Sequence, residues 1–184
     1  MTFQTNFNPL LSSQCGSCDL VTFRPYQRSD RPWVLKANSH FYQSFHNFDV
    51  IFTNAVDAAL DVLEDKISNP ESNYLITEST ARPVGCIFFS SETATVGRIR
   101  LFFIEHAHRG QGIGSRMLRN VLANAGLNGI ETVVVSTFDR HPEACRLYES
   151  FGFEVANRFW STAFGQTMQQ LDYQISLDST SRDQ

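Results

Sequence analysis

The chain has 184 residues, a hydrophobic share of 42%, 16 phenylalanines and a formal net charge of −4. This length and composition favour one globular domain with a substantial core, and they argue against a disordered chain. The charge gives no general case for nucleic acid or an anionic membrane as a partner. No apolar run reaches the length of a membrane span, and the first twenty residues lack a signal-peptide pattern, so we expect a cytoplasmic protein.

The first 19 residues form a polar leader without periodicity, and we expect it to be poorly ordered. Within it, Cys15 and Cys18 have the spacing of a redox pair or of half a zinc site. A structural zinc needs four ligands, and no second pair of matching spacing lies nearby, so we expect no metal. Whether these two cysteines have a role is left open. Cys86 and Cys145 fall in a strand and a helix pattern, where buried packing is expected.

Residues 20–177 carry the patterns of a single domain, and a polar tail at 178–184 follows it. Helices are predicted where apolar residues recur every three or four positions, and strands where β-branched and aromatic residues lie between turn residues. In chain order the pattern predicts a strand at Leu20–Arg24, a helix at Trp33–His46, a second helix between Asp49 and the loop at Ser68–Asn73, and strands at Tyr74–Thr77, Val84–Ser90 and Val96–Glu105, joined by turns at Ser79–Pro83 and Ser91–Thr95.

Glycines occupy three alternate positions directly after the last of these strands, at Gly110, Gly112 and Gly114, and a helical pattern follows them. Such a turn brings bare backbone N–H groups to a helix N-terminus, where an anion, typically phosphate, is favoured. A Walker loop is excluded because Ser115 follows without a lysine, and the dinucleotide fingerprint is excluded by the glycine spacing. An anion-binding loop and a plain tight connection remain as alternatives.

The second half of the chain continues the alternation of helices and strands. Gly126 and Gly129 mark the end of the helix after the glycine loop, and Asp139 is a suitable N-cap for the next one. The complete order is β-α-α-β-β-β-α-β-α-β-β, an α/β arrangement around a mixed sheet. The remaining predicted elements are a strand at Ile130–Ser136, a helix from Asp139 to Gly152, and strands at Phe153–Trp160 and Gln169–Leu177.

Two motifs in this order resemble the GNAT superfamily of acetyl-CoA-dependent N-acetyltransferases over about residues 20–177. The first is Arg-x-x-Gly-x-Gly at 109–114, and the second is Ala-x-x-Leu-Tyr-x-x-x-Gly-Phe at 144–153. Arg100-Leu101 and Phe164-Gly165 are also similar to the acetyltransferase half of MarR-GNAT fusion proteins, and a DNA-binding half is not expected here. The resemblance implies the GNAT fold, a mixed and mostly antiparallel sheet flanked by helices.

The resemblance also implies acetyl-CoA as co-substrate and a set of site residues. The pantetheine arm would lie between a splayed fourth and fifth strand, and Tyr148 would be the general acid. His141 stands where many members carry a cofactor-contacting asparagine, and an imidazole can also donate a hydrogen bond. The other cofactor-binding residues implied are Phe102, Phe103 and Ile104 along the strand and Arg109, Gly110, Gln111, Gly112, Ile113, Gly114 and Ser115 in the pyrophosphate loop.

The general base is not assigned by the sequence. An alkyl ammonium with a pKa of about 10.4 must lose a proton before it attacks a thioester. Strand positions where several family members hold a carboxylate are here Arg98 or Arg100 and Ser136. Arg100 indicates either an anionic group on the substrate or an ion pair with a neighbouring acid. The candidates for the base are Glu78, Glu105, His40 and His106.

The leading hypothesis is an N-acetyltransferase that acts on a primary amine of a small molecule or a peptide. One alternative is an acyl-CoA-binding sensor module without turnover, and another is a partner-binding protein that uses its aromatic-rich first helix. Aromatic side chains within Trp33–Leu63 and Phe159–Met168 predict either an apolar substrate pocket or core packing. The acceptor, the acyl length and the oligomeric state, including a homodimer, are not determined by the sequence.

Overall fold

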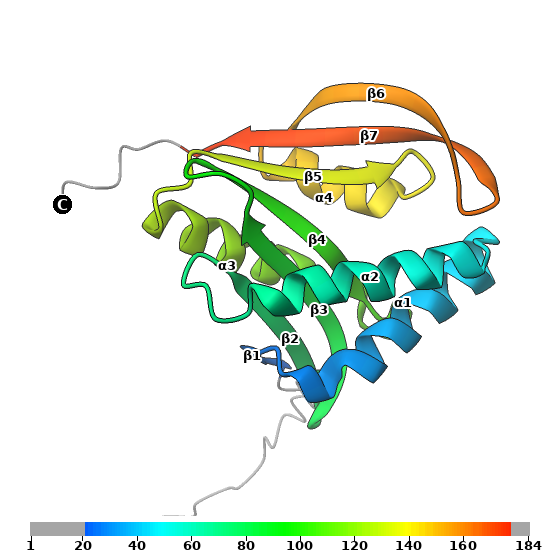
Figure 1. The fold of residues 1–184 in the computed structure, drawn as a ribbon, viewed down its shortest axis with the longest axis horizontal. Helices are drawn as coiled ribbons and strands as arrows, with labels where there is room; N and C mark the ends of the chain where they lie inside the picture. Colours follow the sequence, from blue (N-terminus) through cyan, green and yellow to red (C-terminus); the bar gives the residue numbers. More distant parts are fainter. Residues whose placement is uncertain (1–20, 178–184) are drawn as a thin grey trace, which may run out of the picture.

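The computed structural model of the protein describes residues 21–177 (Figure 1). The predicted leader with Cys15 and Cys18, and the predicted tail, lie outside the described residues. The elements are β1 (Val21–Pro25), α1 (Arg31–His46), α2 (Val50–Asp65), β2 (Asn73–Ser79), β3 (Arg82–Ser91), β4 (Val96–Ile104), α3 (Ile113–Leu127), β5 (Thr132–Phe138), α4 (Pro142–Ser150), β6 (Glu154–Ala163) and β7 (Gln166–Ser176), with short 3-10 turns η1 (Arg28–Asp30) and η2 (His106–His108). Their order confirms the predicted one.

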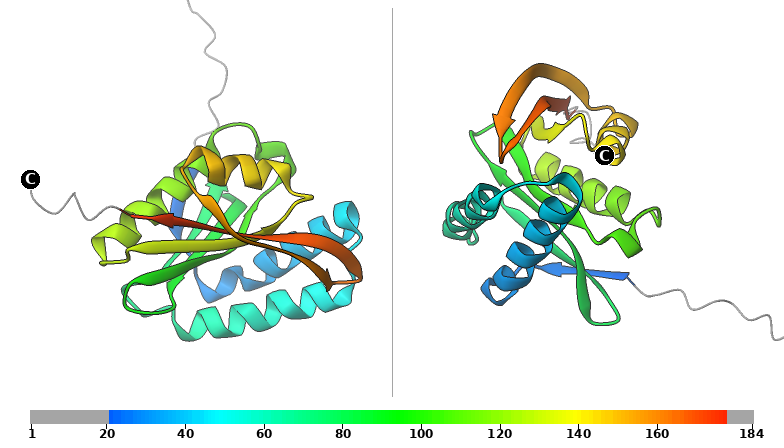
Figure 2. Two further views of the ribbon diagram at one scale, coloured as in Figure 1. Left: turned by 90° about the horizontal axis from the view of Figure 1, so that it is seen from above. Right: turned by 90° about the vertical axis from the view of Figure 1, so that its right-hand side faces the viewer.

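The strands form one sheet of seven in the order β1-β2-β3-β4-β5-β7-β6. The β4–β5 pair is parallel, and every other neighbouring pair is antiparallel. Helices α1 and α2 cover one face of the sheet, and α3 and α4 cover the other (Figures 1 and 2). The predicted mixed, mostly antiparallel sheet flanked by helices is therefore confirmed. Within residues 21–177, no helix is long and apolar enough to cross a membrane.

Two hydrophobic clusters hold the helices to the sheet, one on each face. Strand β3 contributes to both, because successive side chains of a strand point to opposite faces. Phe88 packs with Val34 and Leu60 under α1 and α2. Phe89 packs with Met117 and with residues of β5 and β7 under α3 and α4. This double burial explains the continuous apolar run of the strand, which is typical of strands covered on both sides.

Strands β4 and β5 diverge after a short parallel stretch, and this divergence positions the site. They pair over Val96–Ile99 and Thr132–Val135 and then separate (Figure 1). On the other edge of β4, Cys86 pairs with Phe103 while Phe88 pairs with Arg100, so two residues of β4 oppose one of β3. Leu101 in this bulge has a φ of 47°. A bulge bends its strand, and here it turns the end of β4 away from β5.

The turn between β2 and β3 is shorter than predicted. It consists of Thr80 and Ala81, with φ angles of 48° and 60°, and Pro83 belongs to β3. Proline lacks a backbone N–H and is confined to strand edges and bulges. Pro83 pairs with Glu78 at such a register shift. The prediction of a five-residue turn was wrong because this proline sits in an irregular part of the ladder.

Two predicted helix ends were also wrong. Helix α4 begins at Pro142 with His141 in the N-cap position. Asp139 instead continues the end of β5, since its N–H donates to the carbonyl of Gln169 at 3.0 Å. Gly126 lies inside α3, and Gly129 after it has a φ of 80°. The residue that ends the helix in the left-handed conformation is thus Gly129 and not Gly126, as expected for a glycine just beyond a helix.

Candidate active site

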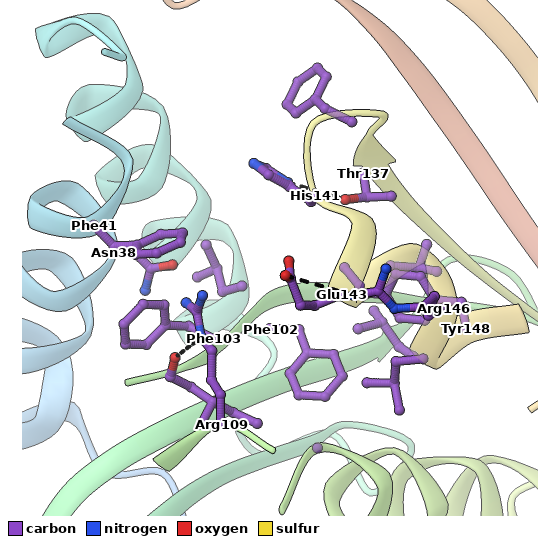
Figure 3. Close-up of a pocket in the computed structure, with 18 of the residues that line it drawn as sticks. Asn38, Phe41, Phe102, Phe103, Arg109, Thr137, His141, Glu143, Arg146 and Tyr148 are labelled. Atoms are coloured by element: carbon purple, nitrogen blue, oxygen red, sulfur yellow. Dashed lines mark hydrogen bonds and ion pairs between the residues drawn. The ribbon is translucent and has the colours of Figure 1, made fainter. Parts of the chain in front are cut away.

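A cavity of about 550 Å³ fills the opening between β4 and β5. Its walls come from α1, the end of β4, the loop into α3, the end of β5 and the first turns of α4 (Figure 3). Because the two strands do not pair here, their facing edges carry backbone groups that no neighbouring strand satisfies. The opening predicted from the family resemblance is therefore present, and the implied site residues Phe102, Phe103, Ile104, Tyr148 and His141 all line it.

The glycine loop presents its backbone to this cavity. Gly110 and Gly112 have φ angles of 74° and 75°, and a Cβ at either position would meet nothing within 4 Å. Gly112 is the N-cap of α3, and no side chain caps this helix. A Cβ on Gly114 would lie 3.2 Å from Leu147 and 3.3 Å from Ile104. The glycines therefore serve both conformation and close packing, and the N–H groups of the first turn of α3 are available to an anion.

The side chain of Arg109 extends across the cleft toward α1 (Figure 3). Its Nε donates to the carbonyl oxygen of Ile104 at 2.9 Å, and its guanidinium carbon lies 4.3 Å from the centre of the Phe41 ring. Burial lowers the pKa of Arg109. Since arginine stays protonated in proteins, a positive charge stands inside the mouth of the cavity, partly removed from water.

Tyr148 lies on α4 at the floor of the cleft. It is 4% exposed, and its ring contacts Phe102 and Tyr173 at centroid distances of 6.4 and 5.7 Å. Burial raises the pKa of its hydroxyl, which therefore stays neutral. Among residues 21–177 the hydroxyl makes no hydrogen bond, and Tyr148 lines the cavity.

A pair of histidines forms the wall opposite the glycine loop. The rings of His46, from α1, and His141 have centroids 4.5 Å apart. Nδ1 of His141 is 3.3 Å from Oγ1 of Thr137, and its Nε2 is buried without a partner in the described chain. Burial, followed by the charges of His46 and Arg109, lowers the pKa of His141 to about 4. Burial also lowers the pKa of His46. Both rings are thus neutral at neutral pH, and burial makes each a weaker base than a free imidazole.

None of the four side chains considered as the base from the sequence lines the cavity. Glu78 accepts from Nε of Arg24 at 2.8 Å, near the opposite edge of the sheet. His40 is exposed on α1, and Glu105 and His106 lie outside the lining. The structure instead brings other polar side chains to the cavity that the sequence reasoning missed, among them Asn38, Tyr42, His46, His108, Arg140 and Glu143.

The lining is rich in arginine and poor in carboxylate. Glu143 is the one acidic side chain among the lining residues, and it lies 3.7 Å from Arg146. Arg100 pairs with Glu92 at 2.7 Å, which is the ion-pair alternative proposed for it. In the part of the chain that the structure describes, no three side chains of His, Cys, Asp or Glu gather into a metal site.

The low pKa of His141 predicts a pH-dependent stability difference. Between pH 6.5 and 4 the unfolded chain takes up a proton on His141 that the folded protein refuses, so the free energy of unfolding falls as pH falls through this window. In His141→Asn this contribution is absent. We expect the variant to lose less stability than the wild type across the window, by on the order of 1–3 kcal/mol. Urea unfolding at several pH values measures it, and a larger loss in the variant would show that folded His141 is protonated.

The sequence matches a known protein family over a long range that includes the site. The model of the Acetyltransferase (GNAT) family matches residues 25–153. This range covers most of the chain and contains both motifs, the glycine loop and the α4 signature. The chain belongs to the acetyltransferase (GNAT) family. The family inferred from the two motifs is therefore confirmed, and GNAT membership places the chain among acyltransferases.

Individual GNAT relatives match parts of the chain. Human N-acetyltransferase 8B is 32% identical over 113 residues, covering 56% of this chain and 50% of the relative. The spermine/spermidine N(1)-acetyltransferase of Bacillus subtilis is 36% identical over 61 residues, covering 32% of this chain and 40% of the relative. The chain thus spans half or less of the length of these relatives. Their similarity supports the family and leaves the substrate open.

Solved GNAT structures share the fold over nearly the whole described chain. A GNAT family acetyltransferase from Elizabethkingia anophelis with acetyl-CoA bound superposes with a TM-score of 0.62 at 13% identity, covering 85% of this chain and 98% of that one. At this identity the match establishes the fold alone. It confirms the predicted GNAT architecture, and it shows that a protein of this architecture binds acetyl-CoA.

Proposed function

We propose that this GNAT chain is an N-acetyltransferase that transfers an acetyl group from acetyl-CoA to a primary amine of a small molecule or a peptide. One observation carries the proposal. A single cavity joins an uncapped helix N-terminus at Gly112 to a buried, neutral tyrosine hydroxyl at Tyr148. The first feature suits a diphosphate, and the second suits a leaving group that needs a proton.

The cofactor-binding residues follow from the walls of the cavity. The loop Arg109–Ser115 offers backbone N–H groups and open space to the pyrophosphate. The backbone of Phe102–Ile104, beyond the last β4–β5 pair, offers strand-like hydrogen bonds to the amides of the pantetheine arm. Nε2 of His141, which has no partner in residues 21–177, offers a further polar contact in place of the asparagine of many family members.

The reaction is a direct displacement at the thioester supplied by acetyl-CoA. The amine nitrogen forms a bond to the acetyl carbon, the carbon–sulfur bond breaks, and the sulfur takes the proton of the Tyr148 hydroxyl. The nitrogen then loses one proton to the solvent and becomes the neutral amide nitrogen. Holding both reactants in one cleft supplies much of the rate enhancement. The raised pKa of Tyr148 is compatible with this step, because the apolar surroundings that disfavour tyrosinate disfavour a thiolate in the same way.

The proton of the acceptor ammonium needs a second group. His46 and His141 are lining histidines whose lowered pKa keeps them neutral at neutral pH. Because a lowered pKa makes both rings weak bases, we assign the uptake of this proton to water at these rings, which carries it to the solvent. Tyr148 regains its own proton from the solvent once the products leave.

Release of CoA thiol, measured with a panel of primary amines, tests the proposal. We expect thiol release that depends on an amine and equals the amount of acetylated amine found by mass spectrometry. The lining holds one carboxylate, and it is ion-paired, which favours the sensor module as the second candidate. Tight acetyl-CoA binding, shown by calorimetry, without thiol release from any amine would support the sensor and contradict the enzyme.

A further inference from the structure

The end of the cavity away from the glycine loop has an apolar, aromatic wall. We define the acceptor pocket as the lining residues Tyr42, His46, Phe52, Phe138, Arg140 and His141. Within it, the centroid of the Tyr42 ring lies 4.5 Å from the centroid of the Phe52 ring and 5.2 Å from that of the His141 ring. Aromatic walls of this kind bind the apolar body of a small molecule and fix its orientation.

Contacts join the α1–α2 corner to the β6–β7 hairpin, and Phe52 of the acceptor pocket packs against Phe164 of that hairpin. The N–H of Asp49 donates to the carbonyl of Phe164 at 3.1 Å, and Nε2 of Gln166 donates to the carbonyl of Asn47 at 3.3 Å. The pocket is therefore built from segments far apart in the sequence. An acceptor bound against these aromatic walls loses part of its contact with water, which strengthens its interactions with nearby charges.

Those charges are positive. Arg100 and Arg146, two of the four lining arginines, have a carboxylate partner. Arg109 and Arg140 have no carboxylate within ion-pair distance among residues 21–177. Arg140 reaches neutral oxygens only, Oε1 of Gln166 at 3.3 Å and the carbonyl of Thr167 at 3.4 Å. Its guanidinium retains the capacity to bind an anion at the edge of the acceptor pocket.

The two unpaired guanidinium groups have different tasks. Arg109 belongs to the loop that we assign to the pyrophosphate, and its guanidinium is held by the carbonyl of Ile104 and the ring of Phe41. Arg140 follows β5, and its hydrogen bonds run to the β6–β7 hairpin, which borders the acceptor pocket. A planar guanidinium binds a carboxylate through two parallel hydrogen bonds, and such charge-assisted bonds are the stronger class.

A polycationic acceptor does not suit this lining. Spermidine carries several ammonium groups, and each needs a carboxylate or another acceptor when it leaves water. The lining offers Glu143 as its one carboxylate, with a side chain that is 68% exposed and paired with Arg146. Arg140 would repel a second ammonium nearby.

Taking the proposed acetyl transfer as its basis, we infer that the acceptor is an amine that carries a carboxylate on an aromatic or apolar body, that Arg140 binds the carboxylate, and that polyamines are poor acceptors. The chain would then differ in substrate from the Bacillus subtilis relative, whose name specifies spermine and spermidine.

Three amines and two variants test the inference, with thiol release as the readout. Phenylalanine and phenethylamine share a ring and a primary amine and differ by the carboxylate, and spermidine is the polycation. In the wild type we expect kcat/KM for phenylalanine to exceed that for each of the other two by about tenfold or more. In Arg140→Gln we expect the preference over phenethylamine to disappear, while the KM for acetyl-CoA stays unchanged.

Comparing the ratio of the two aromatic amines between wild type and variant cancels the difference in their own amine pKa values. Arg158→Gln on β6, an exposed arginine outside the cavity, is the matched control and should keep the wild-type ratio. Spermidine turnover equal to that of phenylalanine, or an equal effect of Arg140→Gln on both aromatic amines, would overturn the inference. Thiol release from none of these three amines, when other amines of the panel are acetylated, would overturn the inference alone. Release from no amine of the panel would overturn the proposed function, and the inference with it.

Discussion

Replacing Tyr148 with phenylalanine is expected to lower kcat by about 10²–10⁴-fold, the usual contribution of a general acid. The ring of Tyr148 fills a buried site against Phe102 and Tyr173, and phenylalanine keeps that packing. The hydroxyl has no partner to lose among residues 21–177, so the thermal stability should be close to that of the wild type. Acetyl-CoA affinity should change little, since one neutral hydrogen bond contributes about 0.5–1.5 kcal/mol.

The neighbouring Tyr173 provides a matched control. It is 1% exposed, and its hydroxyl donates to Glu149 at 2.8 Å, outside the cavity lining. Tyr173→Phe should therefore cost stability and leave turnover per folded molecule intact, the opposite pattern to Tyr148→Phe. If Tyr148→Phe kept the wild-type kcat in an assay limited by chemistry, Tyr148 would have no part in the mechanism.

Replacing Gly112 with valine is expected to weaken acetyl-CoA binding by about tenfold or more, because charge-assisted hydrogen bonds to the pyrophosphate contribute about 1.5–3 kcal/mol each. Gly112 has a φ of 75°, and the space its Cβ would enter is open in the structure. A side chain there would stand where the pyrophosphate is proposed to lie. The left-handed conformation also costs a residue with a Cβ about 1–2 kcal/mol, which would shift the loop.

Because the same strain lowers stability, the loss of affinity needs a control with equal strain elsewhere. Gly152 at the end of α4 has a φ of 88°, and its Cβ would make an ordinary contact with Ile175 at 3.8 Å. Gly152→Val should lose stability and keep its acetyl-CoA affinity. Calorimetry on both folded variants measures the difference. Undiminished affinity in Gly112→Val would show that the pyrophosphate binds elsewhere.

The order of elements was predictable because each carries its own periodicity and end signals. The loop between β4 and α3 and the C-terminal end of α4 followed from glycines whose local conformation requires them, such as Gly112 and Gly152. The bulge of β4 was not predictable, since Leu101 adopts a φ of 47° that no sequence rule assigns to leucine. This bulge lies directly after the last β4–β5 pair, where the cleft opens.

The acceptor side of the site was less predictable than the cofactor side. The pyrophosphate loop is continuous in the sequence, whereas His46 and His141 meet only through the folded arrangement of α1 and α4. The aromatic residues of α1 also divide between uses that the sequence could not separate. Phe41 and Tyr42 line the cavity, and Phe45 is 62% exposed. The sequence supplied the residue types, and the fold decided which of them face the cleft.

Amide hydrogen exchange of the wild-type protein, with and without acetyl-CoA, tests the central claim that the opening between β4 and β5 holds this molecule. We expect acetyl-CoA to slow amide exchange in two segments, at the amides of Phe102–Ile104 that face away from β3 and at those of Ile113–Ser115. The slowing in these segments should exceed any general slowing of exchange in the rest of the sheet. The β1–β2 ladder, at the opposite edge, supplies that reference. If saturating acetyl-CoA protected neither segment more than it protected the β1–β2 ladder, the result would contradict the claim.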